Sequence, residues 1–214
     1  MNSFTKKEKI LIKKLNTPEK VQDFLNNLRF NFEAHGETLR SPLFVLRHKE
    51  AHCFEGALLG AYVLSQHGFR PYLVHLKAEK EDYDHVIVPF KIGKFWGALS
   101  KTNHAVLRYR EPVYKNIREL ALSYFHEYFL NNGQKTLRQY SALLNLNAFG
   151  KPARLDDASR SGGGWELLEG DLWGIDAELD KIKHFDIVPR SYVKKLRKAD
   201  NVEIRAGKII EYKR

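Results

Sequence analysis

The only cysteine of the chain, Cys53, comes directly before an apolar segment that ends near Gln66. Apolar residues recur in this segment at helical spacing, so we predict a buried helix over residues 54–66. The first N–H groups of a helix have no acceptors within it, and the positive end of the helix dipole stabilises a thiolate. Cys53 is therefore placed to act as a nucleophile, and the same N–H groups would bind the oxyanion of an acyl intermediate.

The candidate base for this thiol is His85, which begins a short run of β-prone residues. A histidine at the start of a strand beside the helix would reach the sulfur and accept its proton. The alternative is that Cys53 is an ordinary buried side chain, because free cysteines are among the most buried residues. An enzyme requires an acidic thiol in an accessible cleft, and a binding module requires neither.

Four short segments carry a resemblance to a known family: Cys53-Phe54-Glu55-Gly56-Ala57-Leu58-Leu59, His67-Gly68-Phe69-Arg70-Pro71, Asp84-His85-Val86 and Phe95-Trp96-Gly97. Their order and spacing, over about residues 18 to 103, resemble the core of the transglutaminase-like superfamily. That core has a helix that begins with the nucleophilic cysteine and packs on strands that supply a histidine and then an acid. Its members include protein crosslinking enzymes, peptide N-glycanases, and bacterial proteases and amidases.

The resemblance implies that Cys53 is the nucleophile and His85 the base of a papain-like pair. The implied reaction is hydrolysis of an amide or related acyl bond, or acyl transfer, through an acyl-enzyme. The implied partner is a peptide or another amide-containing substrate, and neither a metal nor an organic cofactor is implied.

The third position of the family pattern departs from the usual aspartate, because residues 97–103 contain no carboxylate. Ser100 is the positional match and would accept a hydrogen bond from the imidazole, and Asn103 would orient the ring as an asparagine does in papain-like enzymes. Asp84 is not expected to substitute, because neighbours in a strand point to opposite faces. The departure keeps open a second hypothesis, a catalytically silent binding module with the same fold.

Three further residues are candidates for substrate binding: His52, Trp96 and Arg108. His52 precedes the nucleophile and would line the cleft or donate to an oxyanion, although an exposed loop histidine is the alternative. Arg108 and Arg110 would lie on one face of a strand and form a small anion-binding patch. We expect no metal site, because no second ligand pair accompanies His52 and Cys53 at structural spacing.

The elements expected around these residues form an α+β fold, in which the central helix packs on an antiparallel sheet. We predict strands over 72–76, 85–88, 95–99 and 105–109, with Pro89 ending its strand, bulging it or lying at an edge. We predict helices over 18–29 and 116–130, separated from the cysteine helix by an ordered loop over 31–49. In the tail we expect a helix over 175–183, another after Pro189, and a hairpin across 205–208.

The expected domain organisation has four parts. A basic N-terminal segment, residues 1–16, precedes a transglutaminase-like, cysteine-protease-like core over 17–145. A linker over 146–164, with three consecutive glycines, leads to a small α+β C-terminal extension over 165–214.

The composition of the chain limits which classes of partner we expect. The chain has 214 residues, 43% of them hydrophobic, and no run of about 18 uncharged apolar residues that would cross a bilayer. One cysteine and no signal-peptide core lead us to expect a cytoplasmic protein without a membrane partner. The net charge of +10 raises nucleic acid binding as a third hypothesis, but no nucleic-acid motif is present, so we expect a solvated basic face.

Overall fold

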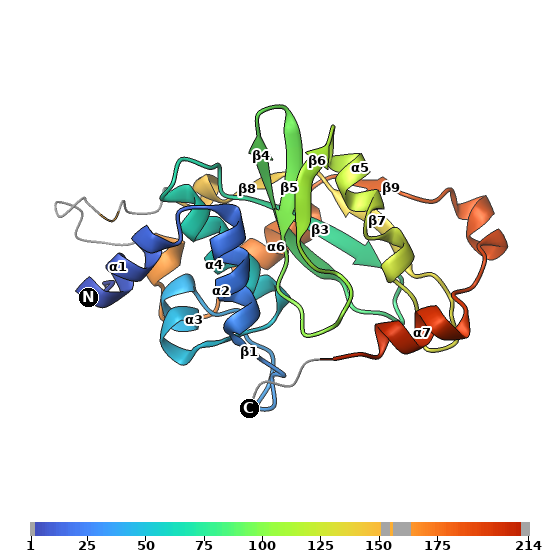
Figure 1. The fold of residues 1–214 in the computed structure, drawn as a ribbon, viewed down its shortest axis with the longest axis horizontal. Helices are drawn as coiled ribbons and strands as arrows, with labels where there is room; N and C mark the ends of the chain where they lie inside the picture. Colours follow the sequence, from blue (N-terminus) through green and yellow to red (C-terminus); the bar gives the residue numbers. More distant parts are fainter. Residues whose placement is uncertain (1–2, 151–154, 156–163, 211–214) are drawn as a thin grey trace.

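The computed structural model describes residues 3–150, 155 and 164–210, and it has a mixed α+β fold built on an antiparallel sheet (Figure 1). The seven strands of this sheet pair in the order β6-β5-β4-β3-β7-β9, and β8 pairs with β3. Each of these pairs is antiparallel. The strands are β3 Tyr72–Ala78, β4 His85–Ile92, β5 Phe95–Leu99, β6 Arg110–Tyr114, β7 Leu137–Ser141, β8 Leu144–Asn145 and β9 His184–Asp186.

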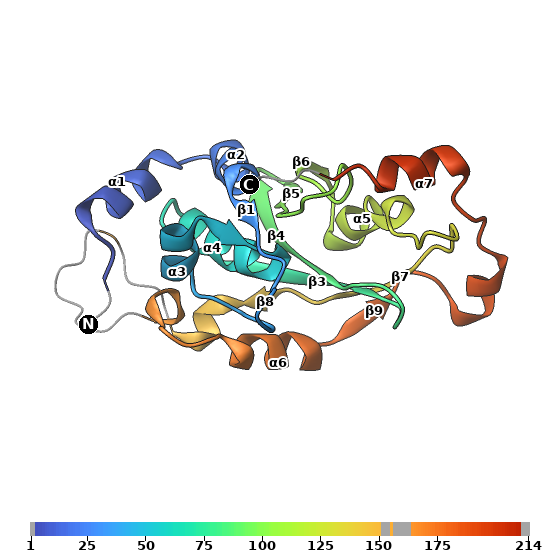
Figure 2. The ribbon, with the colours of Figure 1, turned by 90° about the horizontal axis from the view of Figure 1, so that it is seen from below.

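The helix that begins with the cysteine, α4 Cys53–Ser65, packs against β4. Every residue of α4 from Phe54 to Leu64 is buried, which agrees with the all-round apolar sequence. Other N-terminal elements surround this helix, as Figures 1 and 2 show: α1 Lys6–Lys14, α2 Pro18–Asn27, α3 Pro42–His48 and a parallel pair of short strands, β1 Arg29–Phe30 and β2 Glu50–Ala51. The predictions of helices over 54–66 and 18–29 are therefore confirmed to within two residues.

The sheet has a hydrophobic core on each face, because strand side chains alternate between faces. In β4, Val86, Val88 and Phe90 pack with the N-terminal helices. Ile87 faces the opposite core, which includes α5 Ile117–Leu122. His85 is the first residue of β4, and β4 is the strand that α4 contacts most.

Pro89 does not end its strand, because β4 continues to Ile92 and Pro89 pairs with Ala98 of β5. The pairing of β4 with β3 extends only from His85 to Ile87. From Val88 onward β4 pairs with β5 alone, so proline occupies a locally unpaired edge, one of the three arrangements expected.

Three predictions of local structure between residues 31 and 130 are wrong. The loop expected over 31–49 contains α3, because Pro42 occupies the first helical position, where its missing N–H costs nothing. The strand expected over 105–109 is not formed, since Leu107 adopts a left-handed backbone with φ 59°, and β6 begins only at Arg110. The helix expected over 116–130 ends at Leu122 and is followed by a separate 3-10 turn, η1 Phe125–Glu127.

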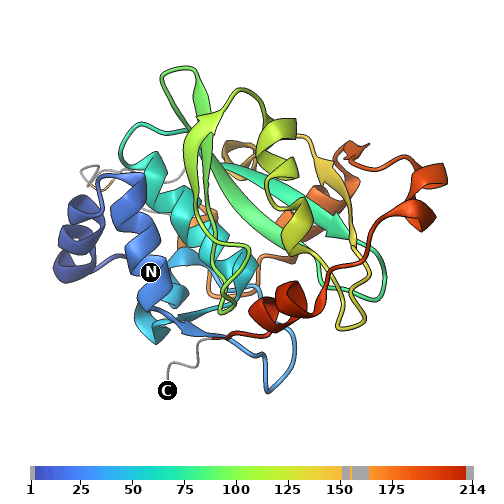
Figure 3. The same cartoon turned by 45° about the vertical axis from the view of Figure 1, so that its right-hand side comes forward.

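The C-terminal residues add to the same sheet and core. Strand β9 pairs with β7, and Ile175 and Leu179 of α6 Trp173–Lys181 lie in the core with α4. The hairpin expected across 205–208 is wrong, because Asp200 and Glu203 form a capping box that begins a helix, α7. Figure 3 shows α7 at the lower edge of the molecule. The remaining C-terminal elements are η3 Trp165–Leu167, η4 Arg190–Lys195 and α7 Asn201–Gly207.

The linker expected over 146–164 lies largely outside the described residues. Its first part forms a 3-10 turn, η2 Leu146–Phe149, and Leu155 packs against the core. Within residues 3–150, 155 and 164–210, no helix is both long and apolar enough to cross a membrane.

Candidate active site

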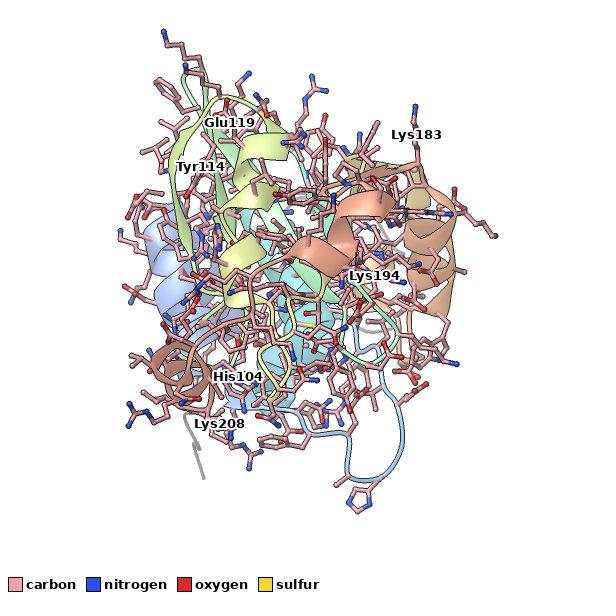
Figure 4. The ribbon with its side chains drawn as sticks, turned by 90° about the vertical axis from the view of Figure 1, so that its right-hand side faces the viewer. His104, Tyr114, Glu119, Lys183, Lys194 and Lys208 are labelled. Atoms are coloured by element: carbon pink, nitrogen blue, oxygen red, sulfur yellow. The ribbon has the colours of Figure 1, made fainter. Side chains whose placement is uncertain are left out.

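A cavity of about 760 Å³ lies at the N-terminal end of α4. Cys53 and His85 both line it. In Figure 4, His104 and Lys208 lie close together at the lower edge of the molecule, and both also line the cavity. The rest of the wall comes from segments far apart in sequence: 30–33, 52–53, 82–85, 101–104, 106–107, 127–131, 204, 207–208 and 210.

Helix α4 begins at Cys53 because His52 caps it. The Phe54 N–H donates to Nδ1 of His52 over 3.2 Å, and the backbone N–H of His52 donates to the Glu55 carboxylate over 3.1 Å. Nε2 of His52 donates to the Thr38 carbonyl over 2.8 Å. The ring is therefore fixed at the cavity wall, and Cys53, which is half-buried, presents its sulfur at the first turn.

The orientation of the His85 ring follows from two hydrogen bonds. Nε2 lies 2.7 Å from Oγ of Ser100, and that hydroxyl donates to the Leu107 carbonyl. Because a carbonyl only accepts, the hydroxyl proton is used on Leu107, and Nε2 of His85 must be the donor to Ser100. The neutral ring therefore has its lone pair at Nδ1, the nitrogen that remains available to the Cys53 thiol, whose pKa the His85 ring lowers.

Leu107 is held in its left-handed conformation by a charged group. Its N–H donates to the Glu127 carboxylate over 2.7 Å, and the other oxygen of Glu127 pairs with Arg110 at 2.7 Å. The Arg110 guanidinium in turn lies over the Tyr124 ring, 4.0 Å from its centroid. A leucine with positive φ is strained, so these contacts determine where its carbonyl meets Ser100.

The thiol of Cys53 is strongly acidic in this setting. Burial disfavours the thiolate, but its interactions with the His52 and His85 rings outweigh burial and lower the pKa of Cys53 to about 5. The site therefore favours the thiolate of Cys53 at neutral pH.

The two candidates for the third position differ in what they contact. Ser100 makes the hydrogen bond to His85, whereas within the described residues no hydrogen bond joins the buried amide of Asn103 to that ring. Asn103 instead forms part of the cavity wall. Asp84 also lines the cavity, but its carboxylate bonds to His75 at 2.9 Å and accepts the Ala78 N–H at 2.7 Å.

The sequence matches no protein-family model, and it matches no curated protein.

Of the three substrate-binding candidates, the structure brings only His52 to the cavity wall. Trp96 packs with the second core, and the Lys91 amino group lies 5.3 Å from its ring centroid. The backbone carbonyl of Arg108 accepts hydrogen bonds from Tyr124 and Arg110. In the described part of the chain, no group of three or more His, Cys, Asp and Glu side chains is placed to hold a metal ion.

Sequence reasoning missed Leu107, Glu127 and Tyr128, which all line the cavity. The last two stood on the apolar helix expected over 116–130, where an aromatic side chain and an acid have ordinary packing and solvation roles. The strain at Leu107 has no signal in a sequence, because leucine does not favour positive φ.

Proposed function

We propose that this protein is a thiol-dependent enzyme that acts on an amide or related acyl bond, with Cys53 as nucleophile and His85 as general base. The observation that carries the proposal is the tautomer of His85. The Ser100 hydroxyl oxygen accepts a hydrogen bond from Nε2–H, so Nδ1 is the unprotonated nitrogen that remains for the thiol. A cysteine that served only as a packing residue would need neither an oriented imidazole nor a cavity.

The arrangement of elements supports a transglutaminase-like core. The cysteine begins α4, α4 packs on β4, and β4 begins with His85. The next strand, β5, pairs antiparallel with β4 and leads directly to Ser100. These are the positions that the family pattern gives to the nucleophile, the base and the residue that orients the base.

The proposed reaction uses each of these groups in turn. The Cys53 thiolate attacks the carbonyl carbon, a C–S bond forms, and the carbonyl electron pair moves to oxygen. Collapse of this intermediate breaks the bond to the leaving amine, which takes the proton from the His85 imidazolium. Water, or an amine in acyl transfer, then attacks the thioester as His85 removes its proton, and the thiolate is released.

The test is the rate of Cys53 alkylation by iodoacetamide as a function of pH, which reports one residue because the chain has no other thiol. The native protein should reach its plateau well below the free-thiol pKa of about 8.5. In His85→Ala the midpoint should move upward and the plateau at neutral pH should be lost. The matched control is His35→Ala, which removes an exposed imidazole that does not line the cavity.

A native thiol that titrates near the free value, or that responds equally to His85→Ala and His35→Ala, contradicts the proposal. That result would favour the silent binding module with the same fold.

A further inference from the structure

Tyr128 places a buried hydroxyl in the wall of the cavity that holds Cys53. The side chain is only 3% exposed, and its Oη atom has no hydrogen-bond partner in the described structure. The backbone of the same residue is fully used, because its N–H donates to the Phe125 carbonyl and its carbonyl accepts the Thr136 N–H. An orphaned hydroxyl is unfavourable in a folded protein, so one that persists at a cavity calls for a ligand.

The position of Tyr128 distinguishes it from Tyr109, whose hydroxyl is also buried without a partner. Tyr109 does not line the cavity and stacks on Phe90, with ring centroids 5.9 Å apart. The same chemical group therefore occurs in two settings, one facing the thiol cavity and the other within the packed core.

The charges around Tyr128 keep its proton in place. Burial, followed by the negative charges of Cys53, Asp82 and Asp84, raises the pKa of Tyr128 far above its ordinary value. The hydroxyl therefore remains a hydrogen-bond donor throughout the range in which Cys53 is a thiolate. It is near enough to interact with the Cys53 charge, yet it makes no hydrogen bond to the sulfur.

A second donor belongs to Cys53 itself. The backbone N–H of Cys53 is the first of α4, so it has no acceptor within the helix. The neighbouring N–H, that of Phe54, is already used by His52. A substrate oxygen placed beside the sulfur would therefore face one backbone donor and the Tyr128 hydroxyl.

We propose that the Tyr128 hydroxyl is a catalytic hydrogen-bond donor that, together with the Cys53 N–H, stabilises the oxyanion of an acyl substrate. The inference rests on the proposed function and adds the residue that distinguishes acyl substrates from other electrophiles. When the thiolate attacks a carbonyl carbon, the C–S bond forms and the carbonyl electron pair moves to the oxygen between these donors. When the intermediate collapses, that pair re-forms the carbonyl and the bond to the leaving group breaks.

The test compares two reactions of the same thiol in Tyr128→Phe. Acylation by p-nitrophenyl acetate passes through an oxyanion, and its rate is measured from the burst of p-nitrophenolate that it releases. Alkylation by iodoacetamide displaces iodide and forms no oxyanion. We expect acylation to slow by about 10²- to 10³-fold, the usual effect of losing one oxyanion donor, while the alkylation rate and its pH profile stay unchanged.

Folding does not confound this comparison, because Tyr128→Phe removes only a hydroxyl that has no partner, and the melting temperature should stay equal or rise. Tyr109→Phe is the matched control, since it removes a partnerless hydroxyl away from the cavity and should leave both rates unchanged.

Two outcomes overturn the inference alone: acylation that is unchanged in Tyr128→Phe, and acylation and alkylation that fall by the same factor. The second would mean that Tyr128 acts on the thiol rather than on the oxyanion. A native thiol that titrates like free cysteine and gives no burst overturns the proposed function, and this inference with it.

Discussion

Cys53 contacts two imidazoles that are held in different ways. His52 uses Nε2 for the Thr38 carbonyl and Nδ1 for the Phe54 N–H, so it is first a helix cap. His85 uses Nε2 for Ser100 and keeps Nδ1 for the thiol. In the proposed reaction His85 is thus the ring that exchanges a proton, whereas His52 caps the helix and interacts with Cys53 in a way that lowers the pKa of the thiol.

His52→Asn separates these two roles, because asparagine is among the best N-cap residues and preserves the start of α4. Losing the imidazole removes an interaction that lowers the pKa of Cys53. We expect the midpoint of the iodoacetamide profile to rise from about 5 in the native protein, by one to two pH units, the effect of about one charged hydrogen bond. An unchanged midpoint would mean that His52 only caps the helix and does not affect the pKa of Cys53.

The residues with a recognisable chemical pattern were the ones that could be predicted. A lone cysteine before an apolar helix, and a histidine at the start of a β-prone run, indicated the pair that the structure places at one cavity. Tyr128 could not be found in this way, because its importance lies in what its hydroxyl lacks. Only the folded environment shows that Oη has no partner.

At the scale of elements, the segment between β5 and η1 determines the orientation of the His85 ring, the proposed base. Glu127 of η1 accepts the Leu107 N–H, and the Leu107 carbonyl accepts the Ser100 hydroxyl that orients His85. The carboxylate missing from the third position is thus present one step away, acting through the backbone of Leu107. In the proposed enzyme, Glu127 is therefore a positioning residue rather than a catalytic one.

Glu127→Ala and Glu127→Gln form a matched pair for this role. Glutamine retains an oxygen that accepts the Leu107 N–H, whereas alanine releases Leu107 from its strained conformation. We expect acylation by p-nitrophenyl acetate to fall by about 10- to 100-fold in Glu127→Ala, since small misplacements of catalytic groups have effects of this size. The alkylation midpoint should also rise in Glu127→Ala, and Glu127→Gln should restore both to near native values.

Equal losses in the two variants would contradict this role and assign the effect to the ion pair with Arg110. Melting curves identify any variant that has simply lost stability.

Elements with a strong hydrophobic period were predicted well, and those set by distant contacts were not. The all-round apolar run gave α4 to within one residue, and β5 was predicted with its observed bounds. The helix expected over 116–130 failed after Leu122, although its apolar spacing continues. There Glu127 is engaged by Leu107 and Arg110, so tertiary contacts override a local pattern.

At the scale of the whole molecule, a hydrogen-bonded pair of histidines connects the C-terminal strand to the middle of the sheet. His184 of β9 donates from Nδ1 to the Ile182 carbonyl, and its Nε2 lies 3.1 Å from Nδ1 of His75 in β3. Nε2 of His75 reaches the Asp84 carboxylate at 2.9 Å. Both outer acceptors require a proton and the central bond requires one more, so the two rings together carry three protons and one positive charge.

Burial and the charge of His75 lower the pKa of His184. Charged groups near the pair include Lys77 of β3 and Asp180 of α6, which lie 3.6 Å apart, and Asp84 and Asp176. The carboxyl of Asp84 stays ionised, because the hydrogen bond and charge of His75 outweigh burial and lower its pKa. Protonation of His184 in acidic solution would therefore add a positive charge to this pair.

Acidification should therefore loosen β9. The pKa of His184 is depressed in the folded protein, so its contribution to stability is complete above the free value of about 6.5 and declines as the pH falls below it. A proton on His184 also turns both nitrogens of the central bond into donors.

Hydrogen exchange, expressed as protection factors for peptides that cover His184–Asp186, should show protection falling between pH 7.5 and 5. In His184→Gln, whose amide oxygen accepts from His75 and does not titrate, protection should be constant over this range. A native protein with constant protection, or a variant that loses it equally, would show that the pair does not control attachment of the C-terminal strand.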